Sequence, residues 1–420
     1  MTQAEQQTVT LVGKRNSWHV GRIRSFLDRN IYPYRWVDSD SPEGAALLGA
    51  VDEDARALQP VVLLPDGSAL AQPTNVKLAR RLGIASRPSL ERYDLMIIGA
   101  GPAGLAAAVY GSSEGLRTVL IEREAPGGQA GQSSKIENYL GFHDGVSGAD
   151  LAREATMQAR RFGTEFVQPT SATSLERDGE GHSVQLSDHS VLNARAVVIA
   201  TGVEYLRLPA PGVAELVGAG VRYGAHPRDA ADLVDKDVFI IGGANSAGQA
   251  AVHFSGPARK VTMLVRAGSL EKSMSRYLIE KIHALPNVEV MTGSELTGAH
   301  GDDCLDAISI SRDGKPSARS LRADALFVFI GAQPYTDWLD GTLARDERGF
   351  ILAGRELVTG SPAPSLPWPL EREPHPLESS MPGVFVAGDT RRGSIKRVAS
   401  AVGEGSMAVQ LIHQYLAEPQ

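Results

Sequence analysis

Short apolar runs alternate with longer mixed segments along the whole chain, and this pattern predicts an α/β fold. The first block ends near Ile84 and is expected to fold as strand, helix, strand, strand, turn and helix. Its expected elements are the strand Val9–Val12, the helix Ser17–Arg29, the strands Tyr34–Val37 and Pro60–Leu64, the turn Pro65-Asp66-Gly67 and a closing helix to Leu82. The polar stretch Ala85–Tyr93, which contains Pro88, is interpreted as a linker.

An apolar strand that leads directly into a glycine-rich turn and a helix occurs twice, at Gly99 and at Gly242. This repeat predicts two doubly wound α/β units, one inserted into the other. The expected domains are residues 1–86, a discontinuous domain of residues 93–207 and 332–420, and an inserted domain of residues 208–331.

The bulk composition excludes several classes of protein. The net charge of -7 gives no basic footprint for nucleic acid. No run of about 18 apolar residues marks a membrane span, and the first residues carry no secretory signal, so we expect a cytoplasmic protein without a membrane role. The single cysteine, Cys304, excludes a disulfide within the chain, and we expect no metal site.

The turn at Gly99 has the chemistry of a dinucleotide site. The strand Asp94–Ile98 is followed by Gly99-Ala100-Gly101-Pro102-Ala103-Gly104 and an alanine-rich helix. In such a turn the first glycine permits the sharp bend, the second admits the pyrophosphate, and the third lets the helix pack on the strand. Glu122 ends the next strand, Thr118–Ile121, and can accept a hydrogen bond from a ribose hydroxyl of FAD or NAD.

From this point the chain resembles the low-molecular-weight thioredoxin reductases, and the resemblance covers most of Asp94–Leu416. Segments that carry it are Gly127-Gly128-Gln129, Glu137–Phe142, Ala200-Thr201-Gly202, Ile330–Pro334 and Gly383–Asp389. By resemblance, Asp389 contacts the ribityl chain of FAD, and the helix that Arg397-Val398-Ala399 opens points at the flavin, where its N–H groups stabilise the anionic reduced form. The residues expected at the FAD are Gly99, Gly101, Pro102, Ala103, Gly104, Glu122, Arg123, Gly128, Gln129, Asn138, Thr201, Gly202, Gly388, Asp389, Arg397, Val398 and Ala399.

The second turn corresponds by resemblance to the NADPH site of the family. It reads Gly242-Gly243-Ala244-Asn245-Ser246, with alanine where the second glycine of the fingerprint belongs. If that position needs a positive φ, alanine costs roughly 1–2 kcal/mol. Arg266 stands where an acid would select NAD, and Lys272 and Arg276 are further candidates for the 2′-phosphate, so we expect NADPH. The alternative is a domain that keeps its fold and binds no nucleotide.

The active-site cysteine pair of the resembled family is missing. After Gly220-Val221-Arg222-Tyr223 the chain reads Gly224-Ala225-His226-Pro227, so glycine and proline replace both cysteines. Disulfide reduction needs an attacking and a resolving thiol, and this chain supplies neither there. His226 and Arg228 are the candidate catalytic residues, for proton delivery to the reduced flavin or for stabilising its charge; a solvated surface pair is the alternative.

The first block resembles a glutaredoxin domain. Ser17-Trp18-His19-Val20 replaces the redox Cys-x-x-Cys at the helix start, and Pro60 matches the substrate-binding cis-proline position. The resemblance implies a redox-inactive domain kept for docking or dimer contacts. The expected fold is therefore α/β, with two Rossmann-like dinucleotide-binding domains, of FAD and NAD(P)H type, after a thioredoxin/glutaredoxin-like domain.

These features predict an FAD-dependent oxidoreductase that takes electrons from NADPH and passes them to a non-disulfide acceptor. A flavodoxin, a ferredoxin, a quinone or a small oxidant would all suit. The alternatives are a flavin-binding sensor or scaffold with little turnover, an enzyme that uses a partner's cysteines or a donor other than NADPH, and a chain that binds a second flavin. By resemblance the protein is a homodimer. In the proline-rich stretch Ser361–Pro369, Trp368 is expected either to cover the flavin or to anchor the loop.

Overall fold

The computed structural model describes residues 8–15, 17–84, 88–133, 135–179, 181–225, 229–302, 304–316, 320–359 and 366–418. The chain divides into two compact units. One contains the described residues up to Gly13, Ile23–Glu204 and the described residues from Gln333 on; the other contains Lys14–Arg22 and Tyr205–Ala332. Among the described residues, no helix is long and apolar enough to cross a membrane.

The N-terminal part is built on a four-stranded sheet in the order β2-β1-β3-β4. Strand β1 (Val9–Val12) runs parallel to β2 (Tyr34–Val37) and antiparallel to β3 (Val61–Leu63), which pairs antiparallel with β4 (Ala69–Ala71). The helices are α1 (Trp18–Arg29), α2 (Pro42–Gly49), α3 (Glu53–Ala57) and α4 (Asn75–Leu82). The three predicted strands and two predicted helices are confirmed, and the Gln59–Pro60 bond is cis.

Helices α2 and α3 and strand β4 are additions to the prediction. The start of α2 carries a readable signal, because the Ser41 side chain accepts a hydrogen bond from Gly44 N and Pro42 occupies the first turn. Strand β4 has only three residues and carries no comparable signal.

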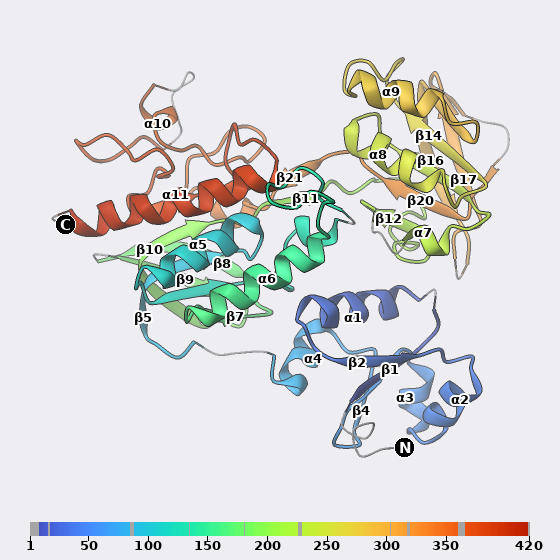
Figure 1. Ribbon diagram of the computed structural model, residues 1–420, viewed down its shortest axis with the longest axis horizontal. Helices are drawn as coiled ribbons and strands as arrows, with labels where there is room; N and C mark the ends of the chain where they lie inside the picture. Colours follow the sequence, from blue (N-terminus) through green and yellow to red (C-terminus); the bar gives the residue numbers. More distant parts are fainter. Residues whose placement is uncertain are drawn as a thin grey trace. The chain divides into compact units, whose positions relative to one another are not determined.

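The first unit also contains a seven-stranded sheet, in which strands β5, β7, β8, β9 and β10 are labelled in Figure 1. Its path is β7-β6-β5-β10-β9-β8, and β22 pairs with β10. The strands are β5 (Arg92–Ile98), β6 (Thr118–Ile121), β7 (Glu165–Val167), β8 (Ala172–Asp178), β9 (Gly181–Leu186), β10 (Val191–Ile199) and β22 (Val384–Val386). Pairs among β7, β6, β5, β10 and β22 are parallel, so their carboxyl ends lie at one edge of the sheet.

Helices α5 (Pro102–Ser113), α6 (Gly148–Arg161) and α11 (Val398–Ala417) belong to the same unit. Strands β6 and β22 are buried along their whole length, as expected of strands covered on both faces. Short elements complete this unit: η2 (Ala130–Gln132), η3 (Asp337–Leu339), α10 (Glu356–Thr359) and η4 (Gly388–Thr390). Strand β11 (Val203–Tyr205) pairs with β21 (Ala332–Pro334) in a separate two-stranded sheet.

The second unit holds a parallel five-stranded sheet in the order β12-β20-β13-β14-β15. These strands are β12 (Val221–Tyr223), β20 (Ala325–Val328), β13 (Asp237–Ile241), β14 (Lys260–Val265) and β15 (Val288–Thr292), and the helices are α7 (Asp229–Asp232), α8 (Asn245–Phe254) and α9 (Arg276–His283). A small antiparallel sheet comprises β16 (Ser294–His300), β17 (Ala307–Arg312), β18 (Lys315–Pro316) and β19 (Leu321–Arg322). The α/β class with two Rossmann-like units is thus confirmed.

Part of the proline-rich stretch, residues 361–365, lies outside the described residues. Trp368, which follows it, packs with Leu366 against a small core of Ala344, Leu352 and Leu357. Its Nε1 donates to the carbonyl of Arg372 at 2.5 Å, and the Arg372 guanidinium lies 5.0 Å from its ring centre. These contacts support the anchoring interpretation of Trp368.

Candidate functional site

The turn after β5 is closed so tightly that two of its residues must be glycine. Gly99 has φ +106°, and a Cβ there would lie 2.3 Å from the carbonyl oxygen of Ala200. A Cβ on Gly104 would lie 1.8 Å from the oxygen of Gly99. The first and third glycines of the fingerprint therefore have the roles that the sequence predicted.

The second glycine lies beside another predicted segment. Gly101 is the N-cap of α5 and has no side chain to cap it, so the first N–H groups of the helix are available to a phosphate. A Cβ on Gly128 would lie 2.9 Å from the Cα of Gly101. The turn and the Gly127-Gly128-Gln129 segment thus meet backbone to backbone.

Glu122 is buried and oriented by the main chain. Its carboxylate accepts from Ala100 N at 2.8 Å and from Glu124 N at 2.8 Å. Each carboxylate oxygen keeps a second lone pair, so the side chain can still accept a hydrogen bond from a ribose hydroxyl. This geometry fits the role predicted for Glu122.

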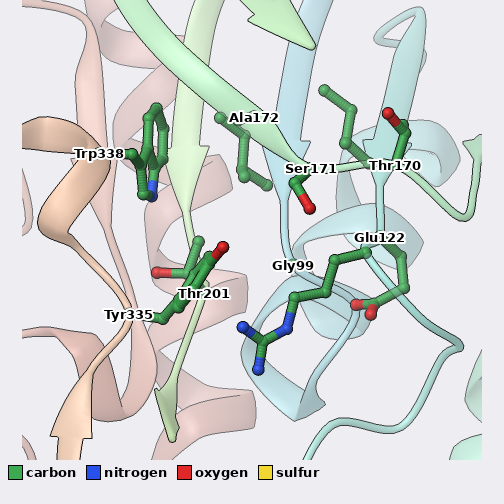
Figure 2. A pocket seen from close by; sticks show the side chains of 11 residues that line it. Gly99, Glu122, Thr170, Ser171, Ala172, Thr201, Tyr335 and Trp338 are labelled. Atoms are coloured by element: carbon green, nitrogen blue, oxygen red, sulfur yellow. The ribbon is translucent and has the colours of Figure 1, made fainter. Parts of the chain in front are cut away.

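An open pocket lies beside Glu122 (Figure 2). It is lined by Ile98, Gly99, Ile121, Glu122, Arg123, Thr170, Ser171, Ala172, Thr201, Tyr335 and Trp338. Arg123 is held by the Tyr335 ring, whose centre is 4.1 Å from the guanidinium carbon, and by Glu204 at 3.6 Å. A carboxylate, a cation and aromatic rings around one cavity suit an adenosine group.

The second predicted signature reaches the same turn from the other end of the chain. Gly388 has φ +77°, and a Cβ there would lie 3.0 Å from the Cβ of Ala103. Thr390, in the same η4 turn, has its Oγ1 3.4 Å from that of Thr201. Burial raises the pKa of Asp389, and Glu404 adds to the rise while Lys396 opposes it.

Glu404 fixes this second turn and was not predicted. Its carboxylate accepts from Gly388 N at 2.7 Å and from Arg391 Nη2 at 2.5 Å. An acidic residue between Gly403 and Gly405, in an otherwise apolar helix, is the sequence signal that could have found it. Thr170, Ser171, Ala172, Tyr335 and Trp338 were also missed, because no local motif marks them.

The residues present fit FAD. The Oε1 atom of Gln129 is buried and has no hydrogen-bond partner among the described residues, which is costly unless a ligand group supplies one. Five glycines leave the backbone open around the turn between β5 and α5: Gly99, Gly101, Gly104, Gly128 and Gly388. When bound, FAD supplies reversible two-electron chemistry that no side chain can provide.

Some residues predicted to bind FAD do not line the pocket beside Glu122. Asn138 is exposed, follows the bridge between Ile136 and Val146, and does not line the cavity. Gly202 has φ +66°, and its carbonyl accepts from Tyr335 N at 3.1 Å. At the start of α11, Arg397 is the N-cap without a side-chain cap, so the helix N–H groups there are open.

The turn after β13 is built like the first. Gly242 has φ +139°, and a Cβ there would lie 2.5 Å from the carbonyl oxygen of Phe329; on Gly243 it would lie 2.9 Å from Val265. Ala244 has φ −98° and ψ 177°, which is ordinary extended backbone. The conditional cost of alanine at this position therefore does not arise, because the position does not need a positive φ.

The loop before α9 is tied to the start of α8. Ser273 Oγ donates to Gly243 O at 2.8 Å, and Ser275 N donates to Asn245 Oδ1 at 2.8 Å. These bonds hold the start of α9, which bears Arg276, near the turn. Ser246, in the first turn of α8, is exposed.

The basic residues predicted for a 2′-phosphate are on the surface of this unit. The Arg266 side chain is 87% exposed and lies 3.9 Å from Glu295, and Arg276 is 92% exposed and pairs with Glu280 at 2.9 Å. Both cations can turn toward a ligand, because exposed ion pairs of this kind contribute little.

The two candidate catalytic residues, His226 and Arg228, lie outside the described residues. Among the described residues, no group of three or more histidine, cysteine or acidic side chains could hold a metal ion.

Comparisons with known proteins identify the class. Residues 93–405 match the family described as pyridine nucleotide-disulphide oxidoreductase. The chain is 32% identical over 334 residues to the thioredoxin reductase of Bacillus subtilis, covering 78% of this chain and 96% of that protein. It is 31% identical over 334 residues to the thioredoxin reductase of Listeria monocytogenes, covering 78% of this chain and 94% of that protein.

Solved structures agree. The thioredoxin reductase of T. acidophilum is 25% identical to this chain, with a TM-score of 0.66, and the match covers 78% of this chain and all (100%) of that one. The fold and the site thus define an oxidoreductase of FAD/NAD(P) type. The chain belongs to the pyridine nucleotide-disulphide oxidoreductase family, as a thioredoxin-reductase-like flavoprotein whose relatives bind FAD and use NADPH.

Proposed function

We propose that this flavoprotein takes electrons from NADPH and passes them from the flavin to a non-disulfide acceptor. The observation that carries the proposal is the cysteine count: the chain has one, Cys304, which is exposed and forms no disulfide. Disulfide reduction by this family's route needs two thiols near the flavin. An acceptor such as a flavodoxin, a ferredoxin, a quinone or a small oxidant removes that need.

The position of the first missing cysteine supports the proposal. Gly224 has φ +77°, and a Cβ there would lie 3.0 Å from the Tyr205 hydroxyl and 3.2 Å from its Cζ. Any side chain at this position would meet the tyrosine in a backbone conformation that favours glycine. The positive φ and the nearby tyrosine thus support glycine, and not a thiol, at this position.

The nucleotide turn supports NADPH as the donor. The Ala244 backbone is unstrained, the α8 N-terminus has no side-chain cap, and Arg266 and Arg276 supply positive charge. We assign proton delivery or charge stabilisation at the reduced flavin to His226 and Arg228, on sequence position alone. We further propose a cytoplasmic homodimer, as expected from the resemblance.

Anaerobic stopped-flow absorbance tests the proposal. Bleaching of the flavin by NADPH, with NADH at least tenfold slower, is expected because a basic residue stands where NAD-selective sites carry an acid. The reduced protein should then be reoxidised by a quinone or a ferredoxin and not by oxidised thioredoxin. Rapid reoxidation by thioredoxin disulfide would refute the non-disulfide acceptor. No bleaching by either nucleotide would favour the alternative of a sensor, a scaffold or an enzyme with a different donor.

We propose that the N-terminal domain is a redox-inactive glutaredoxin-like module kept for docking. The mixed parallel and antiparallel four-stranded sheet supports the likeness. One of its contacts with the rest of the same unit is Arg29, whose side chain is 12% exposed and whose Nε donates to Pro126 O at 3.2 Å. Arg29 Nη2 also donates to Ala125 O, in the loop between Glu122 and Gly127.

Arg29→Ala is expected to weaken FAD binding about threefold to tenfold, because a lost charged hydrogen bond frees the loop that carries Glu122 and Gly128. Fluorescence titration of the apoprotein with FAD measures this. Arg35→Ala is the matched control, since Arg35 pairs only with Glu43 on the surface of the same domain among the ion pairs described. Equal FAD affinities of the two variants would contradict a docking role for Arg29.

A further inference from the structure

The indole N–H of Trp338 has no acceptor among the described residues. Its Nε1 is buried, in the short helix η3, and its ring packs against the core under the seven-stranded sheet. The two other tryptophans with described side chains each have an acceptor: Trp36 Nε1 donates to Gly13 O at 3.2 Å, and Trp368 Nε1 to Arg372 O at 2.5 Å.

A buried donor without a partner is costly. Leaving one N–H unsatisfied destabilises a fold by more than a typical internal hydrogen bond stabilises it. Packing alone would be served by phenylalanine, which has an apolar ring face and no donor. The presence of an indole at this place therefore indicates an acceptor that the described residues do not supply.

The cavity beside Trp338 indicates where that acceptor belongs. Trp338 lines the same cavity as Glu122, Thr201 and Tyr335. Figure 2 shows its nitrogen on the side of the ring that faces Thr201 and Tyr335, while Glu122 lies on the opposite wall. Glu122 accepts a ribose hydroxyl in dinucleotide sites of this type, so the group that enters this cavity carries adenine.

We propose that Trp338 Nε1 donates a hydrogen bond to the adenosine half of FAD. Adenine ring nitrogens and ribose oxygens are acceptors, so they can receive the hydrogen bond that the Trp338 N–H offers. Trp338 is then a binding residue for the cofactor, and Glu122 and Trp338 together present an acceptor and a donor to the same nucleoside. This inference concerns the cofactor's nucleotide end and is independent of the electron donor and acceptor.

Trp338→Phe tests it, with Trp368→Phe as the matched control. The dissociation constant of FAD, from quenching of flavin fluorescence on titrating apoprotein, is expected to rise about fivefold in W338F because one hydrogen bond to the ligand is lost. The apoprotein of W338F is expected to melt at the same or a higher temperature than wild type, because the unsatisfied donor is removed. W368F should show the reverse: an unchanged FAD affinity and a lower melting temperature.

AMP distinguishes the adenosine half from the flavin half. Competition of AMP against FAD should weaken in W338F by the same factor as FAD binding, whereas FMN competition should be unaffected. An unchanged FAD affinity, or a loss for FAD without one for AMP, would overturn the proposal. A W338F apoprotein that melts lower by as much as W368F would overturn it too, since that is the result for a purely structural N–H. If W338F does not fold, Trp338→Tyr replaces it in the same measurements.

Discussion

Gly405→Ala is expected to abolish FAD retention and to lower the free energy of unfolding by about 3 kcal/mol or more, since overpacking against a rigid group reaches the upper end of its usual range. A Cβ on Gly405 would lie 2.1 Å from the carbonyl oxygen of Ala103 and 3.0 Å from the Cβ of Ala106. The obstacle is backbone of α5 and cannot rotate away. Helices α5 and α11 would have to separate; α5 begins within the first FAD signature, and α11 holds the second in place because Glu404 accepts from Gly388 N.

Gly403→Ala is the matched control, two residues earlier in the same helix. A Cβ on Gly403 would meet nothing within 4 Å, and the position is exposed. Alanine there is expected to stabilise α11 by about 1 kcal/mol through its higher helix propensity. The ratio of flavin to protein absorbance after purification, with thermal unfolding, compares the two variants. A yellow, stable G405A protein would show that the helices do not need this contact.

His182 is expected to make stability depend on pH between about 6.5 and 4. Its pKa is lowered to about 4, first by burial and second by the charge of Arg177. Both ring nitrogens are buried without a hydrogen-bond partner among the described residues, and the side chain is 1% exposed. It shares the buried face of β9 with Val184 and Leu186, in an apolar core.

The sign follows from the two protonation states. Below pH 6.5 the unfolded chain binds a proton that the folded protein refuses until about pH 4, so stability falls as the pH falls through this window. The shift corresponds to about 3 kcal/mol over the full window. His182→Leu removes the effect, so the difference in unfolding free energy between variant and wild type should grow by about that amount on acidification.

Denaturant unfolding of the FAD-loaded protein at several pH values measures this difference. The control is His143→Gln, because the His143 side chain is 93% exposed and should give curves parallel to wild type. If the free energy of unfolding of His182→Leu also ran parallel to that of wild type across this pH range, His182 would be taking up its proton equally easily in the folded and the unfolded chain.

Much of the cofactor site could be predicted because its residues obey local rules. Gly99 and Gly104 are required where a strand turns directly into a helix, and the acid Glu122 ends the next strand at a fixed distance. The same logic located Gly242 and Gly388, which both have positive φ. The cost of alanine at position 244 is conditional on a positive φ, which a local pattern does not reveal; φ is −98° there, so the cost does not arise.

The remaining site residues could not be predicted, because distant segments bring them together. Trp338 and Tyr335 face Glu122 only after the chain has returned from the inserted unit. Glu404 lies sixteen residues after Gly388, in α11, and its carboxylate accepts a hydrogen bond from Gly388 N. Neither pairing leaves a periodic or spaced signal in the sequence.

The amino-acid sequence alone is enough to establish the class of this protein. It contains two glycine-rich strand–turn–helix units and, near the two ends of the discontinuous FAD domain, the two FAD signatures. It has one cysteine, whereas a dithiol enzyme needs at least two. These features are local, because backbone sterics and thiol chemistry depend on single residues and their immediate neighbours. Three others follow only from the folded chain: Gly224 has a positive φ and lies against the Tyr205 ring, Ala244 is unstrained, and the Trp338 N–H lacks an acceptor among the described residues. Each of these depends on atoms that packing brings from elsewhere in the chain, and close packing fixes their positions too tightly for a local pattern to foretell.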